Sequence, residues 1–394
     1  MQGISVTSGT STTVYRAEKA ISPADGSVSW VVIDDSTYEL HREASAYLDS
    51  LRARHLSWNT ERVYAGRSAL YLTSCAAHGV DWSRPTLGQL ARFMRRLVQE
   101  PLPSRRRDGG GQQRFRSEET ANAVMTTVCE LLRFGARYGW VPAEVAAQLT
   151  QQKYLAYLPP GYNAGEDGQF RTVRARELKF VVVNDGIDWL TFEEVEQLLA
   201  VTDHARDRFL VALLWCTALR IGEALGLRRE DMHLLSNSRS LGCRVEGPHV
   251  HVRRRLNENG ALAKSREPRS VPVTEELVAL YTEYVYEREQ VAEAVNGDMV
   301  FVNLFRGVLG RGMTYSTAKD LFDRLARKAE LTARPHMLRH GAATAWIRAG
   351  QPRDVVQKLL GHLSSSSMVP YIHASEADKR AAVENVAARH GGVA

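Results

Sequence analysis

Residues 209–227 read FLVALLWCTALRIGEALGL, an almost uninterrupted apolar run that contains one arginine and one glutamate. A helix that is apolar on all sides is typical of the centre of a hydrophobic core, and we expect one helix here. Arg220 must then have its nearly buried charge compensated. Glu223 stands three residues on, where a helix places it on the same face. The pair is either a structural ion pair or a guanidinium held rigid for an anion.

The composition on either side of this run divides the chain into four parts. Residues 1–40 are rich in serine and threonine and are expected to be an N-terminal extension with a short strand at Trp30–Ile33. Residues 41–150 have the pattern of an all-helical domain. Residues 151–184 are rich in proline and glycine, which is typical of a linker. Residues 185–394 form a second domain, so the predicted fold class is mainly α with a small β-sheet.

Local signals place several elements within these parts. Apolar periodicity predicts helices over 87–98 and 121–138. Thr191 followed by Glu194 forms a capping box at the start of a further helix. In the second domain, HVHVRRRL and RSVPV are expected to be short strands, joined by a hairpin-like connection with a turn at Asn259-Gly260.

Positive charge is concentrated in the helical domain. The 394 residues include 51 basic and 45 acidic side chains, a net charge of +6. Residues 41–150 hold 16 arginines, no lysine and 10 acids, a net charge of 16 − 10 = +6. Arginine suits phosphate because its planar fork donates two parallel hydrogen bonds. This pattern fits nucleic-acid binding, and equally a solvated surface encoded by a GC-rich genome.

An arginine- and glycine-rich loop, PLPSRRRDGGGQQRFR, interrupts the same domain at residues 101–116. Its glycines make it flexible, so it either becomes ordered along a DNA backbone or remains a surface loop. We take its cationic side chains as candidate DNA contacts: Arg105, Arg106, Arg107, Arg114 and Arg116.

Several classes of protein do not fit the chain. No apolar stretch approaches the roughly 18 residues of a membrane span, and the first residues lack the pattern of a secretory signal. The four cysteines are scattered and form no CxxC pair, so neither a disulfide framework nor a thiolate metal site is expected. The sequence predicts a cytoplasmic protein with no membrane partner.

A second cluster of functional residues is HMLRH, residues 336–340. On a helix, His336, Arg339 and His340 project from one side. Two histidines at this spacing can bind zinc, but Met337 stands where a metalloprotease needs glutamate, and Arg339 would repel a cation. We therefore expect no metal here.

The remaining candidates are a lysine beside the strand turn, Lys264, and two residues near the C-terminus, His362 and Tyr371. A single lysine, histidine or tyrosine is more often a solvated surface residue or part of the packing than a catalytic residue. The whole set has no carboxylate cluster for magnesium and no GxxxxGK[ST] loop for ATP, so no cofactor is expected. Cations, imidazoles and a phenol together suit transfer of a phosphodiester to tyrosine.

At this point the sequence resembles a tyrosine recombinase of the phage integrase family, over about residues 41–385. The motifs that carry the resemblance occur in the family's order: TALRIGEALGL, the lysine hairpin, HMLRHGAAT, and LLGH followed nine residues later by a tyrosine. WLTFEEVEQLLA resembles the usual opening of the catalytic domain, and the helical block resembles the core-binding domain. RRRLNENGALAKSREPRSVPV, with VFVNLFRG, also resembles the transposon-encoded branch called transposase A.

The resemblance implies a role for each matching residue. Arg220 and Arg339 would clamp the scissile phosphate, with a further hydrogen bond from His362. Lys264 would protonate the 5′-hydroxyl leaving group, and His336 would assist proton transfer at the tyrosine. Tyr371 would form a 3′-phosphotyrosine link. His340 is assigned to structural support.

The resemblance also implies an assembly and a biological setting. Family members work as tetramers on two double-stranded DNA sites and pass through a Holliday junction. The tail after residue 371, with Ser375 as helix cap, would dock on a neighbouring protomer or pack on its own domain. A bacterial or phage origin, nucleoid association and accessory proteins would follow. Two alternatives stay open: a non-catalytic DNA-binding relative and a type IB topoisomerase.

Overall fold

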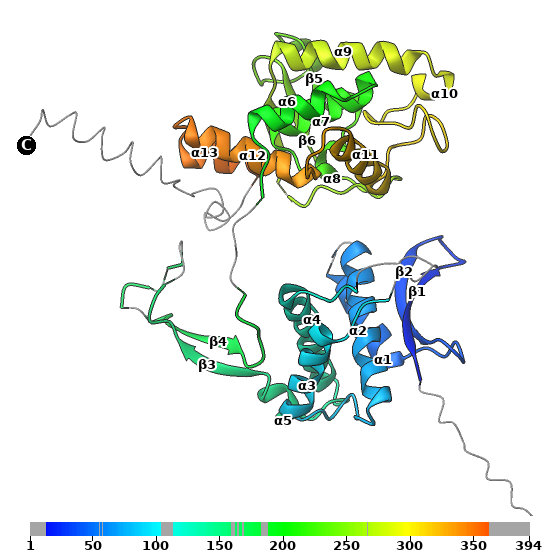
Figure 1. Ribbon diagram of the computed structural model, residues 1–394, viewed down its shortest axis with the longest axis vertical. Coiled ribbons are helices and arrows are strands. Elements are labelled where there is room, and N and C mark those ends of the chain that lie inside the picture. The colour runs from blue at the N-terminus through cyan, green and yellow to red at the C-terminus, as the bar shows by residue number, and fades with distance from the viewer. Residues whose placement is uncertain are drawn as a thin grey trace, which may run out of the picture. The chain divides into compact units, whose positions relative to one another are not determined.

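The computed structural model describes residues 13–54, 56, 58–103, 113–158, 162–163, 165–167, 169–182, 188–265 and 267–361. The chain divides into two compact units, with the division between residues 183 and 184 and with residues 159–162 grouped with the second unit. Each unit, drawn as a ribbon in Figure 1, has its own hydrophobic core of buried side chains. The described residues are mainly helical with small sheets, as the sequence predicted.

Helices dominate the first unit, and β1 and β2 form a hairpin beside them (Figure 1). The α3 helix illustrates why these sequences are helical. Thr86 caps its N-terminus and Gln89 bonds back to the cap, while buried side chains recur at helical spacing: Leu90, Phe93, Met94 and Leu97. The helices of this unit are α1 (Arg42–Ala53), α2 (Trp58–Ala77), α3 (Leu87–Gln99), α4 (Glu118–Arg137) and α5 (Ala143–Ala147).

The N-terminal region is more ordered than the predicted extension. β1 (Tyr15–Ile21) and β2 (Val28–Asp34) pair antiparallel, and β2 includes the predicted strand. Both strands lie on α2. The Tyr15 amide donates to Thr73 Oγ1 at 2.8 Å, and the Trp30 amide donates to Glu61 Oε1 at 2.8 Å. These hydrogen bonds hold the hairpin to a helix that lies far from it in sequence. The local sequence pattern therefore gave only a weak indication of the strands.

A second hairpin lies within the stretch that composition predicted to be a linker. β3 (Thr150–Tyr154) and β4 (Thr172–Arg176) pair antiparallel, and much of the proline and glycine lies between them. Arg176 Nη1 donates to the Asn122 carbonyl on α4 at 3.1 Å. The Asn122 side-chain amide donates to the Phe180 carbonyl at 3.0 Å. The segment that contains Arg176 and Phe180 is therefore hydrogen-bonded to α4.

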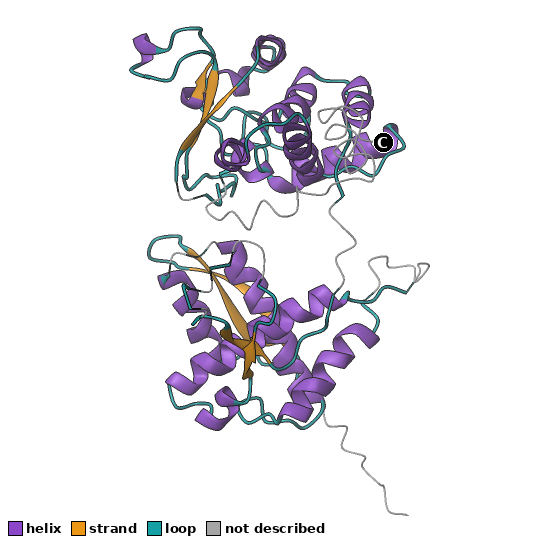
Figure 2. Ribbon diagram, turned by 90° about the vertical axis from the view of Figure 1, so that its left-hand side faces the viewer, coloured by secondary structure: helices purple, strands orange, loops and turns teal. Residues whose placement is uncertain are grey.

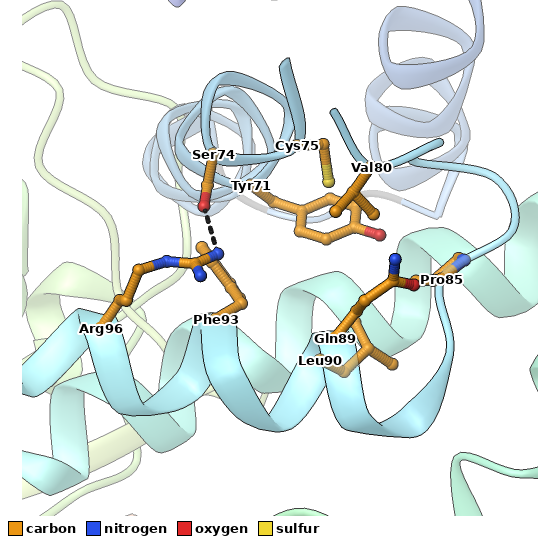
Figure 3. A pocket seen from close by; sticks show the side chains of 9 residues that line it. All are labelled: Tyr71, Ser74, Cys75, Val80, Pro85, Gln89, Leu90, Phe93 and Arg96. Carbon is orange, nitrogen blue, oxygen red and sulfur yellow. Dashed lines mark hydrogen bonds between the residues drawn. The ribbon is translucent and has the colours of Figure 1, made fainter. Parts of the chain in front are cut away.

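Figure 3 shows a small cavity where α2 and α3 approach each other in the first unit. Arg96 Nη2 donates to Ser74 Oγ at 3.1 Å beside it. The cavity holds only about 10 Å³, room for at most one water molecule, so it is a packing gap and no ligand site. Its lining is Tyr71, Ser74, Cys75, Val80, Pro85, Gln89, Leu90, Phe93 and Arg96.

The second unit is built around α7, which packs against α6, α9 and α12 (Figure 1). A three-stranded antiparallel sheet, in the order β5-β6-β7, lies at one side of this unit (Figure 2). The helices are α6 (Phe192–Ala200), α7 (Ala205–Thr217), α8 (Ile221–Ala224), α9 (Glu275–Glu289), α10 (Ala292–Val295), α11 (Tyr315–Lys328), α12 (Pro335–Arg348) and α13 (Arg353–Leu360). The strands are β5 (Met232–His233), β6 (His249–Val252) and β7 (Arg269–Pro272).

The apolar run 209–227 is not the single helix that we expected. α7 ends at Thr217, and Ala218 adopts a left-handed conformation with φ 50°, after which α8 begins. Arg220 is the N-cap residue of α8 and not a mid-helix residue. The predicted capping box of Thr191 and Glu194 at the start of α6 is confirmed. In the part of the chain that the structure describes, no helix is both long and apolar enough to cross a membrane.

Two helical glycines of the first unit should respond oppositely to alanine. A Cβ at Gly135 in α4 would lie 2.6 Å from Cγ2 of the buried Val141, whereas a Cβ at Gly66 in α2 meets nothing within 4 Å. We expect Gly135→Ala to lower the free energy of unfolding by about 1–3 kcal/mol. We expect Gly66→Ala to raise it by about 1 kcal/mol, because alanine favours the helix. Urea unfolding followed by circular dichroism measures both, and equal shifts would contradict the packing described for α4.

Candidate active site

The buried carboxylate of Glu223 lies among three arginines. Its Oε1 accepts from Arg220 Nη1 at 3.0 Å and from Arg269 Nη1 at 3.2 Å. Its Oε2 accepts from Arg269 Nη2 at 2.7 Å and from the backbone amide of Arg220 at 2.9 Å, with Arg339 Nη1 at 4.0 Å. Burial alone would raise the pKa of Glu223, but hydrogen bonds and charge from Arg269, then Arg220, outweigh it and lower the pKa. Glu223 is therefore ionised at neutral pH.

Two of these arginines also bind the carbonyl end of α13. Arg269 Nε donates to the Leu359 carbonyl at 2.9 Å, and Arg339 Nη2 donates to the Leu360 carbonyl at 2.8 Å. The last carbonyls of a helix lack partners within it and form the negative end of its dipole, so guanidinium groups suit this position. A Cβ at Gly361 would lie 2.7 Å from Arg269 Nη1. Glycine at the end of α13 thus allows the arginine its close approach.

The left-handed turn after α7 brings Arg220 to the same carboxylate. Ala218 is fully buried, and its carbonyl accepts a hydrogen bond from Arg339 Nη1 at 2.5 Å. Arg339 thus links α12 to the end of α7 as well as to α13. Its side chain is 6% exposed, whereas that of Arg220 is 27% exposed. Of the two predicted phosphate ligands, Arg220 is the more accessible.

The loop that carries Lys264 lies directly against α8. A Cβ at Gly222 would stand 2.9 Å from the Leu262 carbonyl oxygen, so this glycine permits the close approach of the loop. Asn259 Nδ2 donates to the Leu225 carbonyl at 3.0 Å and holds the preceding turn to the end of α8. Lys264 itself is exposed. The loop backbone is thus anchored while the lysine side chain extends into solvent.

His336 lies in the first turn of α12, and its imidazole is biased toward the neutral form. Partial removal of water from the ring, followed by the charge of Arg334, lowers the pKa of His336, and Asp188 offsets part of this effect. His340 follows one turn later, with its ring centroid 5.9 Å from that of His336. Burial, then His336 and Arg339, lower the pKa of His340 to about 4. His340 is therefore neutral at pH 7.

The position of α12 depends on a glycine one residue after His340. A Cβ at Gly341 would collide with the Leu190 carbonyl oxygen and with the indole ring of Trp215. The absence of a side chain lets α12 pack closely on α7. This close packing brings Arg339 within hydrogen-bonding distance of Ala218.

Four of the six predicted catalytic residues lie in the described part of the chain. Arg220 and Arg339 both approach Glu223, His336 precedes Arg339 by one turn of α12, and Lys264 lies on the loop beside α8. The other two, His362 and Tyr371, lie outside the described residues, as does the tail that follows them.

The candidate DNA-binding arginines are described only in part. Arg105, Arg106 and Arg107 lie outside the described residues. Arg114 is exposed and Arg116 is half-buried, and the Arg114 carbonyl accepts from the Leu102 amide at 2.7 Å.

Sequence reasoning missed the role of Arg269. In the sequence it is only the first residue of the predicted strand RSVPV, which follows the Lys264 connection. The signal that marks it is its place as the first residue of β7, because the pairing of β7 with β6 fixes its direction toward Glu223. Arg269 contacts Glu223, the end of α13 and Gly361, so it is a positioning residue.

Comparison with known proteins gives one consistent result. Residues 188–378 match the phage integrase family. Transposase A from transposon Tn554 of Staphylococcus aureus is 29% identical over 350 residues, which cover 88% of this chain and 91% of that protein. The Tn1549 transposon integrase in complex with a circular intermediate DNA has a TM-score of 0.56 and 16% identity over 87% of this chain and 99% of that one. XerH site-specific recombinase bound to a palindromic difH substrate has a TM-score of 0.55 and 19% identity over 87% of this chain and 85% of that one.

The Tn1549 integrase and XerH structures show a shared fold. The family match and the Tn554 relative show similarity of sequence. Together they define a tyrosine recombinase, an enzyme of the DNA strand-transferase class. Residues 188–378 carry the match to the phage integrase family. The resemblance seen in its motifs is confirmed, and the Tn554 relative agrees with the similarity to transposase A.

We expect Glu223→Gln to destabilise the second unit by about 3–5 kcal/mol, because it leaves buried arginine charge without its anion. Urea unfolding at pH 7 measures the loss. The matched control is Glu230→Gln. The Glu230 carboxylate is 62% exposed, and the substitution removes its ion pair with Arg255. Such exposed pairs contribute about 0–1 kcal/mol, so the control should unfold like the wild type.

The difference in the free energy of unfolding between wild type and Glu223→Gln should depend on pH. The folded-state pKa of Glu223 is lowered, so its contribution is present above the unfolded pKa of about 4.3 and is lost as the pH falls through the folded value. We expect a constant difference between wild type and Glu223→Gln from pH 7 to about pH 5, and a smaller difference below about pH 4.3. A difference that is unchanged in acid would show that the carboxylate charge does not hold the cluster.

Proposed function

We propose that this protein is a site-specific DNA recombinase that integrates and excises a mobile element by a covalent tyrosine mechanism. The observation that carries the proposal is the cluster formed by Glu223 with Arg220, Arg269 and Arg339, here called the Glu223 cluster. It brings Arg220 and Arg339 together from different helices. The cluster also fixes the end of α13 directly before His362 in the chain. A preorganised set of guanidinium donors is what a phosphoryl-transfer centre requires.

Arg220 and Arg339 act on the scissile phosphate. A phosphodiester that is attacked by a nucleophile develops charge on its non-bridging oxygens, and fixed guanidinium donors stabilise that charge. Arg220 is partly exposed while Glu223 holds its Nη1 and its backbone. Arg339 is held in place by the backbone carbonyls of Ala218 and Leu360.

Lys264 and His336 move the protons. The Lys264 ammonium gives its proton to the 5′-oxygen as that oxygen leaves phosphorus. The exposed lysine on an anchored loop can reach a bound strand without a change of its backbone. The lowered pKa of His336 favours the neutral imidazole, which accepts the proton of the attacking phenol.

Tyr371 supplies the nucleophile. Its phenolic oxygen forms a bond to phosphorus and the bond from phosphorus to the 5′-oxygen breaks, which leaves a 3′-phosphotyrosine and a free 5′-hydroxyl. His362 donates a hydrogen bond to a phosphate oxygen. The 5′-hydroxyl of a second strand reverses the step, so a Holliday junction forms without ATP or a catalytic metal.

The first unit serves as the core-binding domain, and DNA is the partner. The Tn1549 integrase structure is a complex with a circular intermediate DNA and the XerH structure is bound to a difH substrate, which supports a DNA partner for a chain of the same fold. Arg105, Arg106, Arg107, Arg114 and Arg116 contact the backbone of the duplex. Four protomers assemble on two sites, each with its C-terminal tail docked on a neighbour, and accessory proteins assist where the element requires them.

Trapping the covalent intermediate tests the mechanism. A duplex made from the DNA ends that flank the gene, nicked near the cleavage position, should give a protein–DNA adduct that resists denaturant. We expect Tyr371→Phe to abolish the adduct, because it removes the nucleophilic oxygen. Arg220→Ala should slow adduct formation at least 10²-fold, the loss typical of one electrostatic donor.

Tyr286→Phe is the matched control, since Tyr286 is 66% exposed on α9, and it should leave the adduct yield unchanged. Failure to form an adduct on any flanking sequence, with DNA still bound, would favour a non-catalytic DNA-binding protein. Relaxation of a supercoiled plasmid by the monomer, without joined products, would favour a topoisomerase.

A salt titration tests the arginine loop. The logarithm of the DNA association constant should fall with the logarithm of salt concentration by about 0.9 per neutralised phosphate. Replacing Arg105, Arg106 and Arg107 together by alanine should reduce that slope by up to about 3 and weaken binding to all sequences. The control replaces the same three residues by lysine, which keeps the charge and should keep the slope. A slope that the alanine variant leaves unchanged would show that the loop does not touch the backbone.

A further inference from the structure

The three-stranded sheet gathers three histidines on one face. His249 and His251 are two residues apart on β6, and alternate residues of a strand point to the same face. His233 on β5 is the direct cross-strand partner of His249, so it shares that face. The centroid of the His233 ring lies 5.0 Å from that of His249 and 4.5 Å from that of His251. Strand register alone therefore brings three imidazoles together.

The connection between β5 and β6 adds a cysteine to this face. A short 3₁₀ helix, Arg239–Leu241, is followed by Gly242 in a left-handed conformation, with φ 73°. The next residue is Cys243, whose amide donates to the Ser238 carbonyl at 3.2 Å. This turn directs the sulfur toward the strand: Cys243 Sγ lies 3.3 Å from His249 Nε2 and 3.4 Å from His251 Nε2.

The separations match the edges of a tetrahedron around a metal ion. With zinc–nitrogen bonds of about 2.0 Å and a zinc–sulfur bond of about 2.3 Å, tetrahedral ligands lie about 3.3 Å apart for two nitrogens and about 3.5 Å for nitrogen and sulfur. His249 Nε2 and His251 Nε2 are 3.2 Å apart, and each is 3.3–3.4 Å from the sulfur. One ligand atom from each of His233, Cys243, His249 and His251 lies within 4.8 Å of all the others.

The surroundings of these side chains also suit metal ligands. His249 Nδ1 faces the Gly247 carbonyl at 2.7 Å, so this nitrogen carries the proton and the Nε2 lone pair points into the cluster. His251 Nδ1 lies 3.1 Å from Ser270 Oγ, a hydroxyl that can accept a hydrogen bond from it. The Val245 amide donates to Cys243 Sγ at 3.5 Å, as expected beside a thiolate.

His233 supplies the independent sign that a ligand belongs here. Its side chain is more than nine-tenths buried, and its Nδ1 atom has no hydrogen-bond partner among the described residues. A buried ring nitrogen without a partner is costly, and a metal ion or the hydrogen bonds around one would offset that cost.

We propose that His233, Cys243, His249 and His251 bind one zinc ion (Zn²⁺) and hold the loop 234–248 on the sheet. Binding releases one proton, that of the Cys243 thiol, and places three neutral imidazoles and one thiolate around the ion. Four protein ligands leave no open position, so the site is structural and not catalytic. The sequence predicted no metal site, because these residues form no CxxC pair and are separated by up to nine intervening positions.

The zinc site would stabilise the sheet that carries Arg269. Ser270, which faces His251, is the neighbour of Arg269 on β7, and Arg269 binds the Glu223 carboxylate. The ion would thus lower the mobility of the strand from which this positioning residue extends. The proposal concerns folding of the sheet and does not depend on the recombination chemistry.

The test uses the full chain purified without a histidine tag. After dialysis, we expect about one equivalent of zinc per chain. The chain freed of metal by a chelator should bind one equivalent of Co²⁺, with visible absorption bands of a tetrahedral site and a near-ultraviolet band from thiolate-to-cobalt charge transfer. Less than a tenth of an equivalent of zinc, with no tetrahedral cobalt spectrum, would overturn the proposal.

Cysteine mapping identifies the ligand without a variant. Zinc should slow alkylation of Cys243 by iodoacetamide at least tenfold and leave Cys216, an exposed cysteine of α7, unprotected. Equal rates with and without zinc would indicate an adventitious ion only.

Variants then separate the site from the fold. Cys243→Ser should lose the charge-transfer band and bind zinc at least tenfold more weakly, whereas Cys216→Ser should match the wild type. If Cys243→Ser does not fold, the alkylation experiment on the wild type still decides between a bound and an adventitious ion. Zinc that binds Cys243→Ser as tightly as the wild type would overturn the assignment of the ligands.

Discussion

The buried carboxylate of Glu223 is the constraint on which the candidate site depends. It is the common partner of Arg220, Arg269 and Arg339, which come from the start of α8, from β7 and from α12. A carboxylate removed from water is stable only when paired, and guanidinium groups removed from water need the same. Each charge is therefore acceptable only in the presence of the others, so three separate segments, α8, β7 and α12, are held in one arrangement.

The cluster carries an excess of positive charge, since three arginines and one glutamate sum to +2. Part of that excess is offset by helix ends, because Arg339 and Arg269 donate to the last carbonyls of α13 and Arg339 also donates to the carbonyl after α7. The neighbouring histidines add little charge, because the pKa values of His336 and His340 are both lowered. The result is a rigid cationic centre whose remaining positive potential suits a phosphodiester.

Much of the architecture was accessible from local patterns. Capping residues and apolar periodicity predicted α3, α4 and α6, because helices form from contacts between residues three and four apart. The order of the motifs predicted the family. Of the two hairpins of the first unit, only the strand at Trp30–Ile33, within β2, was predicted, because short, half-exposed strands are stabilised by partners distant in sequence, such as Thr73 and Asn122.

Local order along the chain was thus enough to specify the helices, the family and the identity of Arg220, His336 and Arg339 as candidates. Three features came only from tertiary structure: the break at Ala218, the position of Arg269 beside Glu223, and the meeting of Cys243 with the histidines of β5 and β6. The physical reason is common to all three. Buried ion pairs, left-handed turns and cross-strand neighbours depend on packing and charge compensation between segments far apart in sequence. Periodic patterns in the local sequence therefore do not predict them.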